Sequence, residues 1–235
     1  MSLSRDDTIA TAKGELEIYA IHHASLMLTW NDKCVLVDPA PLPGSTDPMG
    51  DFKSVPKPDL IVFTHSHFDH FDMSVLEAVV GAHTEIVAPQ EVFDLLPTAL
   101  RARTKVLNNG EHAIISCVPM QAVPMYNITP ERMAFHPKGV GNGYILVFGG
   151  KRIYVAGDSE EAPELAHLTD IDAAFLPMNL PYTQTVEAAA QWVKDFRPAV
   201  VYPYHFGNPD GTFSDLNAFK AEVGNASEVR VLKWY

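Results

Sequence analysis

Short apolar runs rich in β-forming residues recur through the first third of the chain, with polar turn residues between them. The strands predicted there, as a meander, are residues 16–21, 25–30 and 34–37. Asn31-Asp32 is the expected turn before the third strand. After a loop rich in Pro, Gly and Asp, the continuous apolar run 60–63 is typical of a buried strand. Asp72 then stands where a helix is expected to begin, because apolar residues follow it at helical spacing.

Further along the chain, strands continue and then alternate with helices. The additional predicted strands are residues 85–88, 105–107, 112–117, 121–126, 144–148, 152–156, 173–176, 200–202 and 228–232. The additional predicted helices are residues 161–167, 186–196 and 214–223. Gly149-Gly150 predicts the turn of a hairpin. Because both halves contain strands with helices among them, the pattern favours an α/β (α+β) fold in which helices flank a sandwich of two sheets.

The size and composition of the chain suit one compact unit. It has 235 residues, 47% of them apolar, and no repeat, linker or low-complexity tract divides it. We therefore expect a single domain spanning residues 1–235. Every apolar run is shorter than the roughly 20 residues that cross a bilayer, so no membrane span is expected. The polar start of the chain lacks a signal-peptide pattern, which makes a cytoplasmic location the expectation.

The charge and the cysteines narrow the choice of partners. The chain has 17 Lys and Arg against 29 Asp and Glu, a formal net charge of −12. This is the wrong sign for binding a phosphate backbone, so nucleic acid is not an expected partner. We expect a small-molecule substrate and leave self-association as a homo-oligomer open. Cys34 and Cys117 lie apart in strand-like apolar runs, which favours reduced core cysteines over a disulfide.

Residues 64–70, with the sequence THSHFDH, are the strongest chemical signal in the chain. In an extended segment His65 and His67 point the same way, whereas Asp69 and His70 follow after the chain has begun to turn. A single ion is therefore not expected to bind all four, and two adjacent metal positions are implied. Imidazole and carboxylate suit zinc, iron or manganese, and two such ions about 3.5–4 Å apart activate water for hydrolysis.

The remaining ligands are expected just past the ends of other strands, where loops present side chains. Asp158 follows the run Tyr154-Val155-Ala156-Gly157, in which the glycine allows a tight turn, and two carboxylate oxygens suit a bridging ligand. His205 follows an apolar run in the same way. Either residue alone would be interpreted as an ordinary turn or loop residue. Together with the histidine cluster, both become candidate ligands.

The His-x-His-x-Asp-His spacing of His65, His67, Asp69 and His70 resembles that of the metallo-β-lactamase superfamily. The resemblance extends over nearly the whole chain and implies a four-layer αββα sandwich with metal ions at one edge of the two sheets. It also implies a ligand or supporting role for the acidic and imidazole residues that match other positions of that superfamily, which are Asp38, Asp158 as the bridging aspartate, and His205 as the last histidine.

Three short motifs resemble one branch of that superfamily, which includes ascorbate-6-phosphate lactonase and N-acyl phosphatidylethanolamine phospholipase D. They are His23-Ala24-Ser25, Asp38-Pro39 and Pro203-Tyr204-His205. The resemblance places His23 near the metal cleft, where it would support a ligand or face substrate and donate a proton, and packing is the competing interpretation. Asp38 is expected to orient a ligand imidazole by accepting its N–H. Tyr126 is a second candidate proton donor.

One position departs from the superfamily pattern. A third histidine for the first metal is usual after a strand like residues 119–124, but here Asn127 stands near that place. Its neutral oxygen would be a weaker donor and would favour manganese or iron over zinc. Alternatively, His136 reaches the metal from its loop, or water completes the site. One or two divalent ions are therefore expected.

The sequence thus predicts a metal-dependent hydrolase in which metal-activated hydroxide attacks an ester, lactone or phosphoester. Asp69 is expected both to bind metal and to hold the nucleophilic water. The alternative is a metal-binding sensor or scaffold whose incomplete first site supports no turnover. An iron-dependent redox enzyme on the same fold is disfavoured, because the resemblance to that type would require a glutamate in place of His67 and an attached flavin domain.

Overall fold

The first half of the chain forms a seven-stranded sheet whose spatial order follows the sequence. Its strands are β1 (Asp7–Thr11), β2 (Gly14–His22), β3 (Ser25–Trp30), β4 (Lys33–Val37), β5 (Leu60–Val62), β6 (Glu85–Ala88) and β7 (Thr104–Val106). Strands β1 to β4 pair antiparallel as a meander, and β4 to β7 pair parallel. This computed structural model describes residues 3–235.

The second half builds another seven-stranded sheet on the same plan. Its strands are β8 (His112–Ile115), β9 (Val118–Met125), β10 (Gly141–Phe148), β11 (Lys151–Val155), β12 (Ala173–Pro177), β13 (Val200–Tyr204) and β14 (Glu228–Val229). Strands β8 to β11 are antiparallel, and β11 to β14 are parallel. Each parallel half needs crossover connections, which bring helices onto the outer face.

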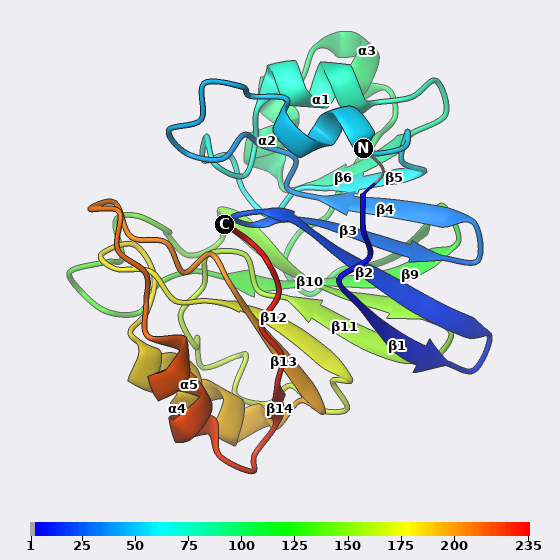
Figure 1. Ribbon diagram of the computed structural model, residues 1–235. Coiled ribbons are helices and arrows are strands. Elements are labelled where there is room, and N and C mark those ends of the chain that lie inside the picture. The colour runs from blue at the N-terminus through cyan, green and yellow to red at the C-terminus, as the bar shows by residue number, and fades with distance from the viewer. Residues whose placement is uncertain (1–2) are drawn as a thin grey trace.

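Helices cover the outer side of both sheets (Figure 1). Those of the first sheet are η1 (Gly50–Ser54), α1 (Met73–Val79), α2 (Gln90–Leu95) and α3 (Thr98–Arg101), and those of the second are α4 (Val186–Phe196) and α5 (Leu216–Val223). Asp72 begins α1 as predicted, because its carboxylate accepts a hydrogen bond from the Val75 amide. The αββα sandwich expected from the sequence is confirmed.

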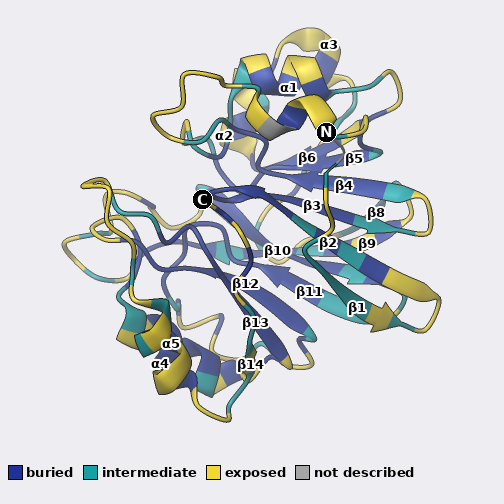
Figure 2. Ribbon diagram, viewed as in Figure 1, coloured by how far each residue is buried: buried dark blue, intermediate teal, exposed yellow. Residues whose placement is uncertain are grey.

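Two buried clusters follow from the alternation of side chains along the strands. One lies between the sheets and includes Val35 and Val62 from the first sheet and Leu146 from the second. Residues of opposite parity, such as Leu36 and Ile61, pack instead against α1 and its neighbours. Figure 2 shows the result, with buried strands in the middle and exposed helix surfaces outside. Among residues 3–235, no helix is long and apolar enough to cross a membrane.

Most local predictions agree with the structure, with two corrections. Asn31 and Asp32 form the predicted turn with φ angles of 47° and 62°. The predicted helix at 161–167 is wrong, because the segment forms turns. The prediction of Cys117 as a core strand residue is also wrong. It lies exposed in the turn between β8 and β9, at a φ of 67°.

Candidate metal centre

The candidate ligands gather at one edge of the sandwich, where strands of both sheets end. Asp38 follows β4, His65 follows β5, Asp158 follows β11 and His205 follows β13. Open sheets commonly bind ligands at the carboxyl ends of their strands. In Figure 1 the loop between β9 and β10 and the loop after β13 both project on the left-hand side of the molecule.

Three residues of this edge have left-handed backbone angles. The φ angles of His23, Asp38 and His205 are 52°, 46° and 45°. Such angles in residues other than glycine cost of order 1–3 kcal/mol each and persist only where the surroundings enforce them. Backbone hydrogen bonds do so here: the His205 amide donates to the His23 carbonyl at 3.1 Å, and the Asp38 amide to the Val62 carbonyl at 3.0 Å.

A first group of possible ligands consists of His65, His67 and His136. Their ligand nitrogens lie within 4.8 Å of one another. Nε2 of His65 is 3.1 Å from Nδ1 of His67. Nε2 of His136 is buried and has no hydrogen-bond partner within the described chain. Three imidazoles therefore converge, although the motif itself supplies only two of them.

A second group surrounds Asp158. Oδ1 of Asp158 lies 3.1 Å from Nε2 of His70, and Oδ2 lies 3.3 Å from Nε2 of His205. Oδ2 is also 3.4 Å from Nε2 of His136, so this one carboxylate contacts members of both groups. Asp69 completes the set, with Oδ2 at 3.4 Å from Nε2 of His205.

These residues fit a divalent cation by a test independent of any resemblance. Buried polar atoms in proteins nearly always have hydrogen-bond partners, because an unpaired one is costly. Five atoms of these residues form no hydrogen bond within residues 3–235, although some lie close to one another: Nε2 of His70 and His136, both ring nitrogens of His205, and Oδ1 of Asp158. Imidazole and carboxylate together are the donor set of zinc, iron and manganese.

Asp38 orients the imidazole of His70 directly and that of His65 through Thr64. Its Oδ2 lies 2.8 Å from Nδ1 of His70 and accepts the Thr64 hydroxyl at 2.6 Å, while Oδ1 accepts the Thr64 amide at 2.7 Å. The Thr64 hydroxyl, having donated to Asp38, can accept the Nδ1 hydrogen of His65 at 2.9 Å. Both histidines then direct Nε2 toward the centre, and this nitrogen binds metal once it carries no proton.

The charges of the centre depend on one another. Burial would raise the pKa of Asp158, but His205 and His70 hold it well below its usual value. Burial would lower the pKa of His205, and the carboxylates of Asp158 and Asp69 instead raise it to about 9. Burial and the proximity of His70 lower the pKa of His65. A cation entering the centre would therefore displace protons, chiefly from His70 and His205.

The side chain of His136, rather than that of Asn127, lies close to the imidazoles of His65 and His67. Asn127 donates its side-chain N–H groups to the carbonyls of Tyr182 at 2.7 Å and Arg132 at 3.0 Å. Its backbone amide donates to the His136 carbonyl at 2.9 Å, which closes the loop that carries His136. The sequence suggested Asn127 because it follows the end of a strand. The imidazole that lies near His65 and His67 belongs instead to a residue later in the same loop.

Glu160, which the sequence did not single out, anchors this loop to the segment that carries Asp158. It is buried, and its Oε2 accepts the backbone amides of Ile128 and Thr129 at 2.7 and 2.6 Å. Its Oε1 accepts Nε of Arg132 at 2.5 Å. The two strand-end segments of the second sheet are thereby fixed to each other.

The two candidate proton donors differ in their distance from the centre: His23 contacts Asp69, whereas Tyr126 contacts Glu164. Tyr126 donates its hydroxyl to Oε2 of Glu164 at 2.7 Å, and its ring packs under the ammonium group of Lys138. It is not among the residues that line the cavity next to the centre. Nε2 of His23 lies 3.1 Å from Oδ2 of Asp69 and is likewise not part of the cavity wall. His23 contacts the centre through Asp69 and through His205, whose ring centroid lies 3.9 Å from that of His23.

A cavity of about 230 Å³ opens onto the centre. Its polar side consists of His67, Asp69, His136, Asp158 and His205. The rest of its lining is aromatic and comes from three different loops: Phe68, Phe135 and Tyr182. These three were not predicted as site residues, although Phe68 lies inside the histidine motif and Phe135 precedes His136.

Comparisons with known proteins agree with this geometry. The family described as "Beta-lactamase superfamily domain" matches residues 17–205. A UPF0173 metal-dependent hydrolase of Pyrococcus abyssi is 28% identical over 226 residues, covering 93% of this chain and 96% of the relative. A crystal structure from Parabacteroides distasonis, assigned as a metal-dependent hydrolase, has a TM-score of 0.86 at 39% identity and covers 98% of this chain and 99% of that chain.

A more distant structure has the same fold. Igni18, a metallo hydrolase from Ignicoccus hospitalis, has a TM-score of 0.74 at 24% identity, with 93% of this chain and 95% of that chain covered. The family match spans most of the chain and confirms the resemblance drawn from the histidine motif. The chain belongs to the beta-lactamase superfamily and, within it, is similar to proteins named metal-dependent hydrolases.

Proposed function

We propose that this protein hydrolyses a small ester, lactone or phosphoester at a centre of two divalent ions. The observation that carries the proposal is the convergence of buried, unpaired ligand atoms on a cavity large enough for a small substrate. His65, His67 and His136 would hold one ion. Asp69, His70 and His205, the ligands that the resemblance implies for a second ion, would hold the other. Asp158 would contact both.

Ions in such a centre supply Lewis-acid activation of water and stabilise the negative charge that develops on the substrate oxygen. The side chains of the chain do the positioning. The Asp69 carboxylate borders the cavity, and its pKa is held low by His205 and His23 against the effect of burial. It stays an ionised acceptor, able to orient a water molecule through a hydrogen bond.

The alternative of a sensor without turnover rested on a missing third imidazole. The ligand nitrogens of His136, His65 and His67 lie close enough together to hold an ion, which supports the hydrolase over this alternative. The metal itself follows from the donor set only as a class: zinc, iron and manganese all accept three imidazoles or a mixed imidazole and carboxylate set.

The test combines metal content with turnover. Protein purified without a histidine tag is stripped, reloaded with zinc, manganese or iron, and measured by plasma mass spectrometry. We expect two ions per chain and hydrolysis of at least one ester, lactone or phosphoester. Asp158→Asn should lose metal and most activity while keeping its fold, whereas Asp94→Asn, on the exposed surface of α2, should lose neither.

Two results would overturn the proposal. If no ion binds under any loading condition, the centre is not a metal site. If fully loaded protein hydrolyses no member of the three substrate classes, the centre binds metal without being a hydrolase.

A further inference from the structure

The cavity above the centre has walls of one chemical kind. Phe68, Phe135 and Tyr182 supply its non-ligand lining, from the loops after β5, β9 and β12. The rings of Phe135 and Tyr182 meet edge to face, with centroids 5.1 Å apart. The Phe68 side chain is 72% exposed, whereas a phenylalanine that only packs in the core is buried. Aromatic groups gathered around a polar floor are typical of a site for an apolar ligand.

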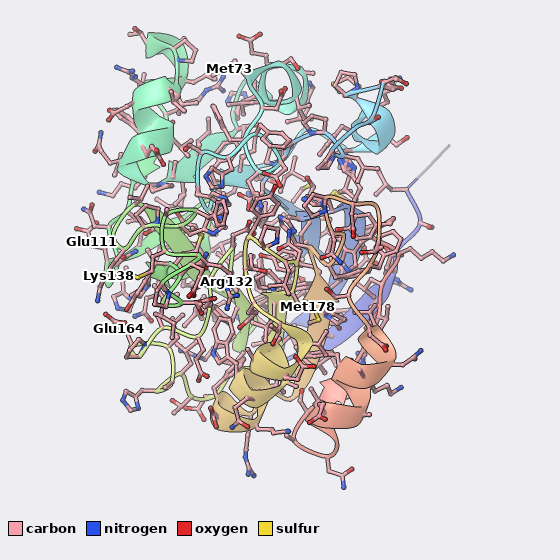
Figure 3. All side chains as sticks on the ribbon, turned by 90° about the vertical axis from the view of Figure 1, so that its left-hand side faces the viewer. Met73, Glu111, Arg132, Lys138, Glu164 and Met178 are labelled. Carbon is pink, nitrogen blue, oxygen red and sulfur yellow. The ribbon has the colours of Figure 1, made fainter. Side chains whose placement is uncertain are left out.

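Cationic side chains are missing from this lining. Neither Lys nor Arg is among the described residues that form the cavity wall. The loop that carries Phe135 does hold two cations, Arg132 and Lys138, but both are engaged. Arg132 donates to Glu160 and to the Thr129 hydroxyl, and Lys138 pairs with Glu164. Figure 3 shows Lys138 and Glu164 side by side on this face of the molecule.

Charge therefore discriminates among the substrate classes. Phosphate groups are usually recognised by arginine, lysine or helix N-termini in addition to any metal ion. The lining offers no such donor, and the chain as a whole has a formal charge of −12, which repels anions at long range. An uncharged substrate avoids both penalties.

Taking the proposed hydrolase as given, we infer that its substrate is an uncharged carboxylic ester or lactone with a short apolar acyl group. The carbonyl lies over the ligand cluster, and the acyl group packs against Phe68, Phe135 and Tyr182. Water adds at the carbonyl carbon and the acyl C–O bond breaks. One proton from the water ends on the released alcohol oxygen, so the products are a carboxylic acid and an alcohol.

The size of the cavity limits the acyl chain. A cavity of about 230 Å³ suits a short acyl chain better than a long one. Burial of each methylene against the aromatic wall is expected to raise kcat/KM by about fourfold. The gain stops when the chain reaches the mouth of the cavity.

The experiment uses metal-loaded protein and one leaving group throughout. The substrates are p-nitrophenyl acetate, butyrate, hexanoate and octanoate, with p-nitrophenyl phosphate and bis(p-nitrophenyl) phosphate for comparison. Each rate is divided by the rate of uncatalysed hydrolysis. We expect the carboxylic esters to be favoured over both phosphoesters, with kcat/KM rising up to hexanoate and then levelling. Calorimetry supplies a reading without turnover, in which hexanoic acid binds more tightly than acetic acid or inorganic phosphate.

Variants test whether the aromatic residues of the cavity cause the preference for longer acyl chains. Phe135→Ala and Tyr182→Ala should flatten the dependence on chain length, whereas Ile114→Ala, exposed on β8 away from the cavity, should leave it unchanged. A preference for either phosphoester, or equal rates along the ester series, overturns the inference and leaves the hydrolase standing. Absence of turnover with every ester and phosphoester overturns the inference, and it removes the hydrolase as well if lactones are equally inert.

Discussion

The hydroxyl oxygen of Tyr235 lies 2.9 Å from Nδ1 of His23. The same oxygen accepts the Gly207 amide hydrogen at 2.9 Å, which leaves the tyrosine hydrogen free to donate to the imidazole. Burial raises the pKa of Tyr235, so the hydroxyl keeps this hydrogen. Burial and the nearby His205 lower the pKa of His23 to about 4, so the ring is neutral. Its single hydrogen is then on Nε2 and points to Asp69.

Tyr235→Phe should therefore lower kcat more than it changes KM. The variant keeps the ring packing but removes the partner that orients His23, and a neutral hydrogen bond worth about 0.5–1.5 kcal/mol corresponds to a loss of about twofold to tenfold. Steady-state kinetics on an ester substrate measures it. Tyr202→Phe is the matched control, because its hydroxyl donates to Asp7 outside the centre. An equal loss in both variants would show a general stability effect instead.

Asp38→Asn should weaken metal binding by about tenfold to hundredfold, the usual effect of removing a carboxylate behind a ligand histidine. The amide is similar in shape but no longer presents an anionic acceptor to both His70 and Thr64. Competition with a chromophoric chelator measures the affinity. Asp172→Asn also removes a carboxylate that accepts a backbone amide, from Arg152, and should retain full affinity. Unchanged affinity in Asp38→Asn would mean that its contacts serve folding alone.

His136→Ala and Asn127→Ala separate the two candidates for the third ligand of the first group. His136→Ala should lower the metal content to about one ion per chain, because it removes a donor atom. Asn127→Ala should keep two ions with weaker affinity, because it only loosens the loop through the lost contacts with Tyr182 and Arg132. Plasma mass spectrometry after reloading gives the counts. The reverse pattern would assign the ligand to Asn127.

Ionisation of Glu161 should lower the free energy of unfolding as the pH rises from 5 to 8. Burial and the neighbouring Asp195 carboxylate raise the pKa of Glu161 from 4.5 to about 7 in the folded state. A raised pKa means that the stabilising contribution is complete below the unfolded value and is lost as pH rises through about 7. Between pH 5 and pH 8, the Tm of Glu161→Gln should therefore fall by less than the Tm of the parent protein.

The control for this pH effect is Glu164, whose pKa is shifted in the opposite direction. The hydrogen bonds from Lys138 and Tyr126 lower the pKa of Glu164 to about 2, so its contribution is constant between pH 5 and 8. Glu164→Gln should lower Tm by a similar amount at both ends of this range. Titration of the metal-centre histidines is common to all variants and cancels in the comparison. A Glu161→Gln slope equal to that of the parent would contradict the prediction.

Strong local patterns predicted most of the fold. The helix at 186–196 and the strands at 25–30 and 85–88 have the predicted bounds, because regular apolar spacing and clear caps define them. Strand β1 was missed because its mixed, partly exposed sequence shows no apolar alternation. Helices α2 and α3 were missed because they are short, are separated by Pro97, and depend on packing against β6 and β7 rather than on propensity.

The candidate site was predictable where ligands are consecutive or follow a strand directly. His65, His67, Asp69 and His70 stand in one motif, and Asp158 and His205 follow buried strands. His136 was only an alternative, because loop closure through Asn127 and Glu160 decides its place and no local pattern encodes that. Contacts across the chain, such as Tyr235 with His23, are likewise set by tertiary packing.

The ligand loops come from both sheets, and this has a consequence for the motions of the fold. In an unfolded chain the donors are dispersed between His65 and His205, so an ion with high affinity binds only the folded form. A bound ion is then a cross-link between the two sheets at this edge. Hydrogen exchange at the ends of β5 and β13 would require the ion to leave first, while amides at the opposite edge, near the turn between β1 and β2, would exchange independently of it.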